Sequence, residues 1–322
     1  MQPFQYLRAS SAEAAIAAAR QDGARYIAGG TTLVDLMRLE VMQPHTVIDI
    51  TGLGGLATIE EVTGGVRIGA LATNTFVAYH PLITARFPAL SQALLSGASP
   101  QLRNMATVGG NLLQRTRCPY FRDGVSPCNK RVPGSGCAAL GGYTRSHAVL
   151  GTSPRCIATH PSDMCVALVA LDAVVHTHGG RAIPIADLHT LPGSHPEIEN
   201  VLAPGELVTH LELPVTALAA RSRYDKVRDR ASYAFALASA AVALDVSGTT
   251  VRDARIALGG VATRPWRAAE AERWLVGRTT SPDNFRRAAA LALDGAIAHG
   301  DNAFKIELAR RTIVRALQRG AS

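Results

Sequence analysis

Apolar residues recur at helical spacing near the start of the chain, over 11–23, where Ser11 precedes the run and a glycine ends it. A short apolar run over 24–30 then leads into two glycines, a second helical pattern covers 31–40, and a second short run covers 45–50. Short apolar runs bounded by turn residues are typical of strands. The first 50 residues therefore predict a βαβ-like unit.

The same patterns continue along the rest of the chain and predict an α+β protein. We expect strands over 64–73, 206–214, 232–246 and 251–261, a hairpin over 174–185, and helices over 74–83, 87–98, 162–173, 264–277, 281–300 and 302–320. Ser281 and Pro282 suit the N-cap and the first turn of one of these helices. The composition changes near 214–223, which predicts one domain over 1–217 and a second over 218–322.

Composition narrows the classes of function. The chain has 322 residues, of which 47% are hydrophobic and 18% charged, so it can bury a full core. Its longest apolar run, over 164–171, is too short to span a bilayer, and its start lacks the apolar segment of a signal peptide. The net charge is +8, but aromatic residues make up only 5% and no nucleic-acid-binding motif is present. We therefore expect neither a membrane nor a nucleic acid as a partner.

Two glycine loops are the first candidates for ligand binding. In "YIAGGTTLVDL" (26–36) and "MATVGGNLLQ" (105–114), paired glycines stand beside threonines at the start of a helical pattern. Glycines let backbone N–H groups approach a phosphate closely, and a helix N-terminus favours its negative charge. Two such loops indicate a ligand with two phosphates or a long ligand, although two structural turns would look the same.

Two charged positions add to this pattern. Asp163 follows Ser162 at the start of a predicted helix, so either residue could cap that helix, and the carboxylate could also accept hydrogen bonds from sugar hydroxyls. Lys226 opens a basic segment over 225–239. This segment is either a solvated surface stretch or part of an anion-binding site.

Three of the five cysteines lie in one loop rich in Pro, Gly and Arg. The spacing is Cys118-x9-Cys128-x8-Cys137-x18-Cys156, without any CxxC pair. Disulfides, a four-cysteine zinc site, an iron–sulfur cluster and unligated thiols all remain open. Nearby basic side chains could offset the negative charge of a cluster; they are Arg117, Arg122, Lys130 and Arg131. Cys165 lies in an apolar helical run and is expected to be a buried bystander.

Taken together, the motifs resemble a known family. The segments "YIAGGTTLVDLMR", "QLRNMATVGGNLLQRTRCPYFRD", "CNKRVPGSGCAAL", "CIATHPSDM" and "KVRDRASYAFALAS" are similar to those of the FAD-binding medium subunits of molybdenum hydroxylases, the xanthine dehydrogenase and aldehyde oxidoreductase family. The resemblance runs nearly end to end. The four-cysteine insert is similar to that of the bacterial periplasmic aldehyde oxidoreductase branch.

This resemblance implies a fold and a set of binding residues. The fold would be the two-subdomain FAD-binding fold of the vanillyl-alcohol-oxidase/CO-dehydrogenase flavoprotein type, followed by a small α+β domain. The two subdomains would cover about 1–55 and 56–217, and an iron–sulfur insert would cover about 115–157.

The resemblance also implies where FAD binds. The pyrophosphate loop would be 27–33 and the second flavin loop 107–111. Asp163 would bind the FAD sugar chain, the strand at Leu207 would pack on the isoalloxazine, and Lys226 would lie near the cofactor. The implied FAD-binding set is Tyr26, Ile27, Ala28, Gly29, Gly30, Thr31, Thr32, Leu33, Thr107, Gly110, Asn111, Asp163, Leu207, Val208 and Lys226. The implied ligands of a [4Fe–4S] cluster are Cys118, Cys128, Cys137 and Cys156.

The resemblance also implies an electron-transfer role within a heterotrimer. A large subunit would carry the molybdenum cofactor and oxidise the aldehyde, and a small subunit would carry [2Fe–2S] clusters that reduce FAD in this chain. FAD would then pass electrons to an external acceptor, so no catalytic residue is expected here. The protein would reach the periplasm by co-export with a partner, or remain in the cytoplasm. Two alternatives stay open: the β-subunit of a 4-hydroxybenzoyl-CoA reductase, and a zinc-stabilised assembly subunit without flavin.

Overall fold

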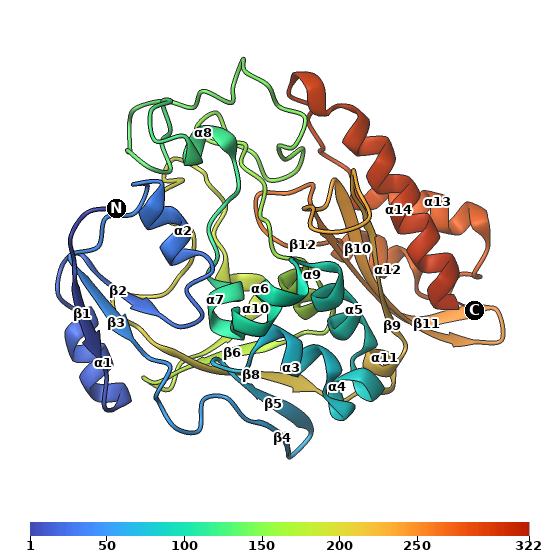
Figure 1. Ribbon diagram of the computed structural model, residues 1–322. Coiled ribbons are helices and arrows are strands. Elements are labelled where there is room, and N and C mark those ends of the chain that lie inside the picture. Colours follow the sequence, from blue (N-terminus) through green and yellow to red (C-terminus); the bar gives the residue numbers. More distant parts are fainter. Residues whose placement is uncertain (322) are drawn as a thin grey trace.

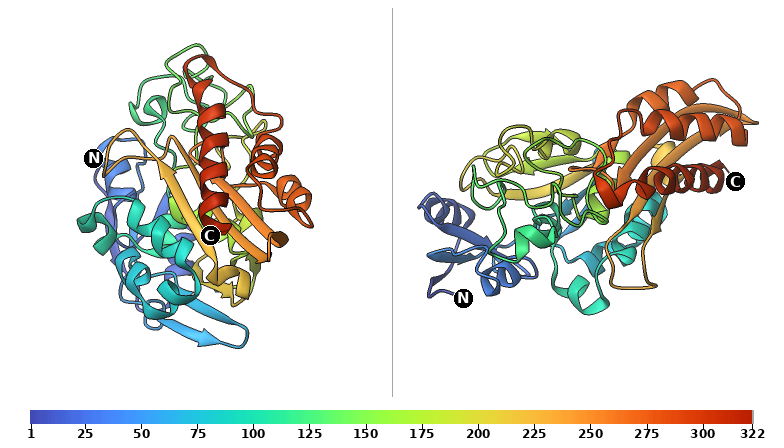
Figure 2. Two further views of the ribbon diagram at one scale, coloured as in Figure 1. Left: turned by 90° about the vertical axis from the view of Figure 1, so that its right-hand side faces the viewer. Right: turned by 90° about the horizontal axis from the view of Figure 1, so that it is seen from above.

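The computed structural model describes residues 1–321, which form three β-sheets with helices packed around them (Figure 1). The predicted α+β class is therefore confirmed. Seen from above, the N-terminal sheet and the C-terminal sheet with its helices lie at opposite ends of the molecule (Figure 2, right). The middle of the chain fills the space between them.

The N-terminal sheet has three parallel strands in the order β1-β3-β2. Its elements are β1 (Gln5–Arg8), α1 (Ala12–Ala19), β2 (Ala24–Ile27), α2 (Leu33–Arg38) and β3 (Thr46–Asp49). The expected βαβ-like unit is present, and the Ser11 hydroxyl caps α1 by accepting from the Ala14 N–H at 3.1 Å. Strand β1 was not expected, because all four of its residues are exposed and show no alternation of apolar and polar positions.

The middle sheet has five antiparallel strands in the order β4-β5-β8-β6-β7. Its strands are β4 (Ile59–Val62), β5 (Gly65–Gly69), β6 (Val174–Thr177), β7 (Ala182–Pro184) and β8 (Val208–Pro214). The helices around it are α3 (Asn74–Tyr79), α4 (Pro81–Arg86), α5 (Pro88–Ser96), α6 (Pro100–Met105), α7 (Val108–Leu112), α9 (Asp163–Ala170) and α10 (Ile185–Leu188). The largest core cluster joins residues of this sheet to residues of α3, α5 and α9.

The C-terminal sheet has four antiparallel strands in the order β12-β11-β10-β9. Its strands are β9 (Ser222–Val227), β10 (Ala238–Ser247), β11 (Thr250–Gly259) and β12 (Trp266–Arg267), and the helices are α11 (Ala217–Ala220), α12 (Ala269–Leu275), α13 (Pro282–Ala292) and α14 (Phe304–Ala321). Helix α14 runs across one face (Figure 2, left), with α12 and α13 beside it. Helices α5 and α9 cover the other face, where Ala241 and Ala257 leave room for them.

Several elements in this region differ from the sequence prediction: the helix expected over 281–300 ends at Ala292, and strand β12 occupies the start of the helix expected over 264–277. Strand β9 was not expected, because charged residues mask its alternation of apolar and polar positions. One of these charged residues, Asp225, is buried and bonded to Arg319 of α14. The strand expected over 232–246 begins only at Ala238. The preceding loop contains Tyr233 with a φ of 50°, a left-handed conformation that does not fit a strand.

The cysteine-rich insert is mostly irregular and contains one short helix, α8 (Pro119–Arg122). In Figure 1 it forms the green loops above α2 and beside α14. The Asn302 side chain donates to the Ala148 carbonyl at 3.0 Å, and the Lys305 Nζ donates to the Ser146 and His147 carbonyls at 3.2 and 2.9 Å. The C-terminal domain therefore holds one side of the insert in place.

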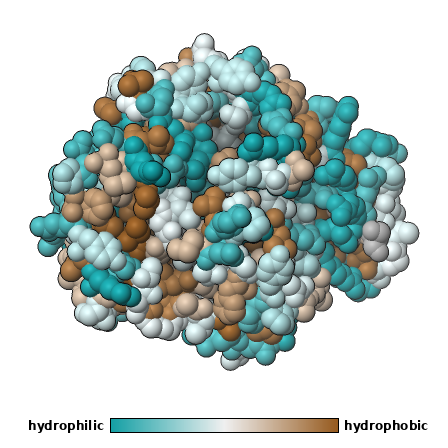
Figure 3. Space-filling model, in the orientation of Figure 1, coloured by the Kyte–Doolittle hydropathy of each residue, from teal (hydrophilic) through white to brown (hydrophobic). Residues whose placement is uncertain are grey.

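The surface of the molecule mixes hydrophilic and hydrophobic residues (Figure 3). On the face shown there, hydrophobic residues gather at the left, over the N-terminal part of the chain. None of the helices over 1–321 is long and apolar enough to cross a membrane.

Lys305 generates a prediction about stability and pH. Its side chain is fully buried, and burial lowers its pKa from 10.5 to about 7. Between these values the unfolded chain binds the proton and the folded chain releases it, so the free energy of unfolding rises with pH at up to about 1.4 kcal/mol per pH unit. Lys305→Met should flatten this rise. Urea unfolding between about pH 7 and pH 10 measures it, and parallel pH profiles for both proteins would contradict the assignment.

Candidate functional site

The two glycine loops are in direct contact. The first loop connects β2 to α2, and the second connects α6 to α7. A Cβ atom on Gly29 would lie 1.8 Å from the backbone oxygen of Met105, so no other residue fits there without moving one loop. Gly30 has a φ of 70°, which also favours glycine. Gly29 is therefore required for the packing between the loops. The sequence alone could not distinguish this role from phosphate binding.

The threonines of the two loops differ in their local role. The Thr107 hydroxyl caps α7 by accepting from the Gly110 N–H at 3.3 Å. Thr32 precedes α2 in the same way but its hydroxyl makes no capping hydrogen bond. Asn111 accepts from the Ser162 hydroxyl at 2.8 Å, which ties the second loop to the start of α9. The Thr32 hydroxyl therefore has no capping role, whereas the Thr107 hydroxyl accepts at the cap and keeps its O–H proton as a donor for a ligand.

A cavity of about 270 Å³ lies along the first loop. The first loop and the start of β8 form most of its wall, together with Thr107 and Gly110 of the second loop. Its residues from the implied set are Tyr26, Ile27, Ala28, Gly29, Gly30, Thr31, Thr32, Leu33, Thr107, Gly110, Leu207 and Val208. Most of its wall is apolar, and Leu207 and Val208 are buried against the core.

A second cavity of about 740 Å³ is lined by residues of both glycine loops and of α9. Asn111, Asp163 and Lys226 line it, and so do several cationic side chains, namely Arg103, Arg117, Arg122 and Arg230. Three residues line both cavities, namely Thr31, Thr32 and Gly110. The two cavities are therefore adjacent at these residues, and each of the fifteen residues of the implied set lines one cavity or both.

Asp163 and Lys226 form a buried ion pair in this cleft. Their side chains are 9% and 4% exposed, and the Lys226 Nζ lies 2.7 Å from one Asp163 oxygen. The other oxygen accepts from the Tyr224 hydroxyl at 2.5 Å, and burial, reinforced by this carboxylate, raises the pKa of Tyr224. Ser162 caps α9, accepting from the Cys165 N–H at 3.1 Å, so Asp163 is free for these contacts. The sequence indicated both charges but neither their pairing nor Tyr224.

The two expected contacts of the isoalloxazine ring are separated. Leu207 and Val208 line the smaller cavity, and Lys226 lines the larger one. The two contacts that the resemblance implies therefore lie in different, adjacent cavities.

The four cysteines of the insert surround one small cavity. Cys118, Cys128, Cys137 and Cys156 all line it, and none of them is in a disulfide. Cys128 and Cys137 are paired across an antiparallel bridge. Burial raises the pKa of Cys118 to about 12 and that of Cys156 to about 11, so these thiols need a metal or cluster to hold them as thiolates at neutral pH. Cys165 lies outside this cavity and is buried in α9, as expected.

The spacing of these thiols bears on the kind of group that fits. Four sulfurs around one zinc ion, with Zn–S bonds of about 2.3 Å, lie about 3.8 Å apart. Within 1–321, no three of the four cysteines bring their sulfur atoms within 4.8 Å of one another. A cluster of several metal atoms holds its ligands farther apart than a single ion does. These thiols are therefore spaced more widely than the ligands of one tetrahedral zinc ion.

The basic residues that were expected to offset the charge of a cluster also make contacts within the chain. Arg117 and Arg122 pair with Asp35 of α2 at 3.1 and 2.8 Å. Arg131 donates to backbone carbonyls of α8 at 2.8 Å. Lys130 lowers the pKa of the Cys156 thiol, although burial outweighs it. The three arginines thus hold the insert against its surroundings, and the offset of a cluster's charge stays a prediction.

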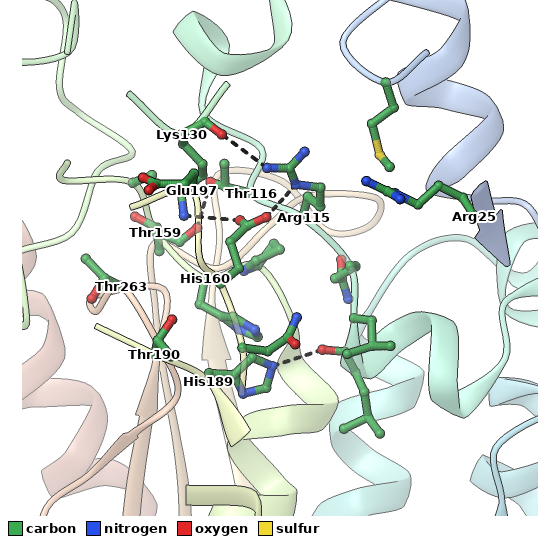
Figure 4. Close-up of a pocket in the computed structure, with 18 residues that line it drawn as sticks. Arg25, Arg115, Thr116, Lys130, Thr159, His160, His189, Thr190, Glu197 and Thr263 are labelled. Carbon is green, nitrogen blue, oxygen red and sulfur yellow. Dashed lines mark hydrogen bonds and ion pairs between the residues drawn. The ribbon is translucent and has the colours of Figure 1, made fainter. Parts of the chain in front are cut away.

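A third pocket, of about 470 Å³, lies between the cleft and the cysteine cavity (Figure 4). It shares Arg25 and Arg115 with the smaller cavity of the cleft, and Thr116 and Lys130 with the cysteine cavity. Glu199 pairs with both Arg115 and Lys130 there. These charges lie in separate segments, and no sequence pattern indicated that they meet.

Comparisons with known proteins agree with this geometry. The chain matches the family described as the FAD binding domain in molybdopterin dehydrogenase over residues 2–216, and the CO dehydrogenase flavoprotein C-terminal domain over residues 222–319. It is 50% identical over 325 residues to the aldehyde oxidoreductase FAD-binding subunit PaoB of Escherichia coli, covering 98% of both chains. It is 28% identical over 291 residues to the carbon monoxide dehydrogenase medium chain of Afipia carboxidovorans, covering 90% of this chain and 85% of the relative.

Solved structures show the same fold. A chain of the Cu,Mo-CO dehydrogenase in its cyanide-inactivated form superposes with a TM-score of 0.77 at 26% identity, covering 100% of this chain and 99% of that chain. A chain of quinoline 2-oxidoreductase from Pseudomonas putida superposes with a TM-score of 0.76 at 25% identity, covering 99% and 97%. With its two glycine loops and these matches over nearly its whole length, the chain belongs to the FAD-binding medium subunits of the molybdenum hydroxylase family of oxidoreductases.

Proposed function

We propose that this chain is the FAD- and [4Fe–4S]-containing electron-transfer subunit of a molybdenum-dependent aldehyde oxidoreductase. The observation that carries the proposal is the presence, in one chain, of a two-cavity cleft framed by glycine loops and a separate cavity lined by four free cysteines. The 50% identity to an aldehyde oxidoreductase FAD-binding subunit supports the aldehyde branch.

FAD fits the cleft as an extended ligand. Its pyrophosphate would lie where the two cavities meet, beside Thr31, Thr32 and Gly110, because these residues line both sides. Backbone N–H groups and hydroxyls at this point suit phosphate oxygens. A nucleotide half and a flavin half can then extend in opposite directions from it.

The two cavities differ in size and charge, and this favours one orientation. The adenine half fits the smaller, largely apolar cavity beside Leu207 and Val208. The larger cavity has room for the three-ring isoalloxazine and contains the buried Lys226 and several arginines. Positive charge near the pyrimidine end stabilises a reduced, anionic flavin. We therefore place the ring near Lys226 and away from Leu207.

The residues of this chain hold the cofactor and set its surroundings. Asp163 fixes Lys226 at 2.7 Å, and both residues line the larger cavity, where the carboxylate can accept hydrogen bonds from the sugar chain. When bound, FAD converts between one-electron and two-electron transfer. No residue of the chain is assigned to bond making or breaking in the substrate.

The partners follow from what the chain lacks. The sequence contains no molybdopterin motif and no [2Fe–2S] cysteine set, so a large molybdenum subunit and a small [2Fe–2S] subunit would complete a heterotrimer. Electrons would leave through this chain to an external acceptor. By analogy with the periplasmic branch, we propose co-export with a partner, with the cytoplasm as the alternative compartment.

Two other functions are separable by simple observations. A 4-hydroxybenzoyl-CoA reductase β-subunit would be encoded beside a large subunit of that reductase. A zinc-stabilised assembly subunit would purify without flavin absorbance and with zinc in place of iron. The spacing of the four thiols argues against zinc.

The subunit role predicts that activity belongs to the complex. The isolated full chain, loaded with FAD, should transfer no electrons from an aldehyde to a dye, and the reconstituted complex should do so readily. A dye-reduction assay with both preparations at equal flavin content measures this. Sustained aldehyde turnover by the chain alone would contradict the proposal.

Gly29→Ala tests the frame of the FAD site. The added Cβ would collide with the Met105 backbone, so the loops must separate and the cleft loses its shape. We expect loss of most bound FAD, with a destabilisation of about 1–3 kcal/mol from overpacking. Gly54→Ala is the matched control, because nothing lies within 4 Å of its Cβ position, and it should keep its FAD. Normal FAD content in Gly29→Ala would contradict this role.

Thr32→Val separates ligand binding from folding. Because the Thr32 hydroxyl does not cap α2, its loss should leave the unfolding midpoint unchanged. Loss of one hydrogen bond to a charged phosphate should weaken FAD binding by about 10-fold. Flavin fluorescence titration measures the affinity. An unchanged affinity would move the pyrophosphate away from this loop.

Cys128→Ser tests the cluster and its role. The insert has few apolar contacts of its own, so we propose that the main role of the cluster is to order the insert. Electron relay would be a secondary role. The variant should lose iron and assemble poorly, while the complex that still forms should turn over at a near-normal rate. Cys165→Ala, outside the cavity, should keep full iron.

Iron analysis with low-temperature EPR after reduction decides between the outcomes. Zinc in place of iron, or no [4Fe–4S] signal in an anaerobically prepared complex, would overturn the cluster. A Cys128→Ser complex that assembled normally but could not reduce FAD would favour the relay role instead.

A further inference from the structure

A buried histidine contacts one of the four cysteines of the insert. The Nε2 atom of His147 lies 3.2 Å from the Sγ atom of Cys118, which is a hydrogen-bond distance. Cys118 directly precedes α8, the short helix in the green loops of Figure 1. The sulfur of Cys156 accepts from a backbone group, the Ala158 N–H at 3.4 Å. Within residues 1–321, no other side chain forms a hydrogen bond to the sulfur of any of the four cysteines.

His147 lies outside the cysteine cavity. All four cysteines line that cavity, and His147 does not. The imidazole therefore contacts the sulfur of Cys118 from outside the space in which we propose that the cluster binds. This is the position of a group that orients and tunes a ligand, and not the position of a further ligand.

Only one placement of the imidazole proton suits a thiolate at this distance. His147 is 1% exposed, and burial favours the neutral imidazole, in which one ring nitrogen carries a proton. A cysteine bound to iron is a thiolate and has no proton to donate. If Nε2 also lacked a proton, two lone pairs would face each other at 3.2 Å. The proton therefore belongs on Nε2, which donates to the Cys118 sulfur.

The second ring nitrogen of His147 agrees with this tautomer. Its Nδ1 atom is buried and has no hydrogen-bond partner in the part of the chain that the structure describes. A proton on Nδ1 would leave that N–H unsatisfied and would also leave Nε2 facing the sulfur without a hydrogen bond. A proton on Nε2 leaves a single free acceptor, so it is the less costly arrangement.

The C-terminal domain fixes the stretch of chain that carries this imidazole. The His147 carbonyl accepts from the Lys305 Nζ at 2.9 Å, and Lys305 is fully buried. The next carbonyl, that of Ala148, accepts from the Asn302 side chain at 3.0 Å. Hydrogen bonds to both carbonyls restrict the backbone, so the ring is held beside Cys118.

We propose that His147 donates an Nε2–H hydrogen bond to the Cys118 thiolate and thereby raises the reduction potential of the cluster. This inference rests on the proposed [4Fe–4S] cluster. Reduction adds one electron to the cluster and its sulfur ligands, and the proton stays on Nε2. A hydrogen bond to a ligand sulfur stabilises the added negative charge and so favours the reduced state. His147 thus acts on the cluster through Cys118, without binding iron.

Redox titration of the assembled complex, followed by low-temperature EPR, tests this role. His147→Phe keeps a ring but removes the donor, and His147→Leu removes the donor with a smaller side chain. In both, the equilibrium constant for reduction of the cluster should fall about 10-fold, which is about 59 mV for a one-electron couple. His147→Gln keeps an N–H donor at a similar reach and should restore most of the wild-type potential. Equal potentials in the wild type and in the two variants without a donor would overturn the proposal.

His299→Gln is the matched control. The ring of this nearby histidine bonds to the Thr152 hydroxyl at 3.2 Å and not to a cysteine, so its loss should leave the potential of the cluster unchanged. The other redox centres of the complex are internal references and should keep their potentials in every variant. A shift of the same size in His299→Gln would contradict a specific role for His147.

A measurement on the wild type does not depend on how the variants fold. With isotopically labelled nitrogen in the histidines, pulsed EPR of the reduced cluster should detect weak coupling to one histidine nitrogen. Strong coupling, as from a nitrogen bound to iron, or no coupling would overturn the hydrogen bond. A wild-type complex without iron would overturn the proposed cluster and this inference with it. A complete cluster whose potential does not depend on His147 would overturn the role of His147 alone.

Discussion

The approach of Gly29 to the backbone of Met105 is the constraint on which the binding cleft depends. It joins a loop of the N-terminal sheet to the loop before α7, two segments that come from different parts of the chain. Only a residue without a side chain permits this approach, and the cleft runs along both sides of the junction. Backbone packing thereby sets the shape of the cleft in which we propose that FAD binds.

Helix α9 links this cleft to the C-terminal domain. Its first residue, Asp163, bonds to Tyr224 and Lys226 of β9, so one buried carboxylate holds the C-terminal sheet against the wall of the larger cavity. Gly259 lets the body of the helix approach β11, since a Cβ there would lie 2.4 Å from a Val166 methyl. The C-terminal domain also anchors the cysteine insert through Lys305. It thus positions both proposed cofactor sites.

Much of this architecture could be predicted from the sequence, because most helices and core strands carry clear periodicity and capping residues. Strands β1 and β9 could not, because β1 is exposed on all residues and β9 buries Asp225, whose partner lies far away on α14. The glycine loops and the group of four cysteines were evident from residue types and spacing. The pairing of Asp163 with Lys226, and the separation of Lys226 from Leu207, depend on long-range packing that local patterns do not encode.

We propose that FAD, as one extended ligand, occupies both cavities, which meet at the glycine loops. The most direct test titrates the flavin-free full chain with FAD and, separately, with FMN, which lacks the adenine half. We expect one FAD per chain, bound at least about 100-fold more tightly than FMN. FMN should bind more weakly because it lacks the adenine half and leaves the smaller cavity without a ligand. Equal affinity for both flavins, or no binding of FAD, would contradict it.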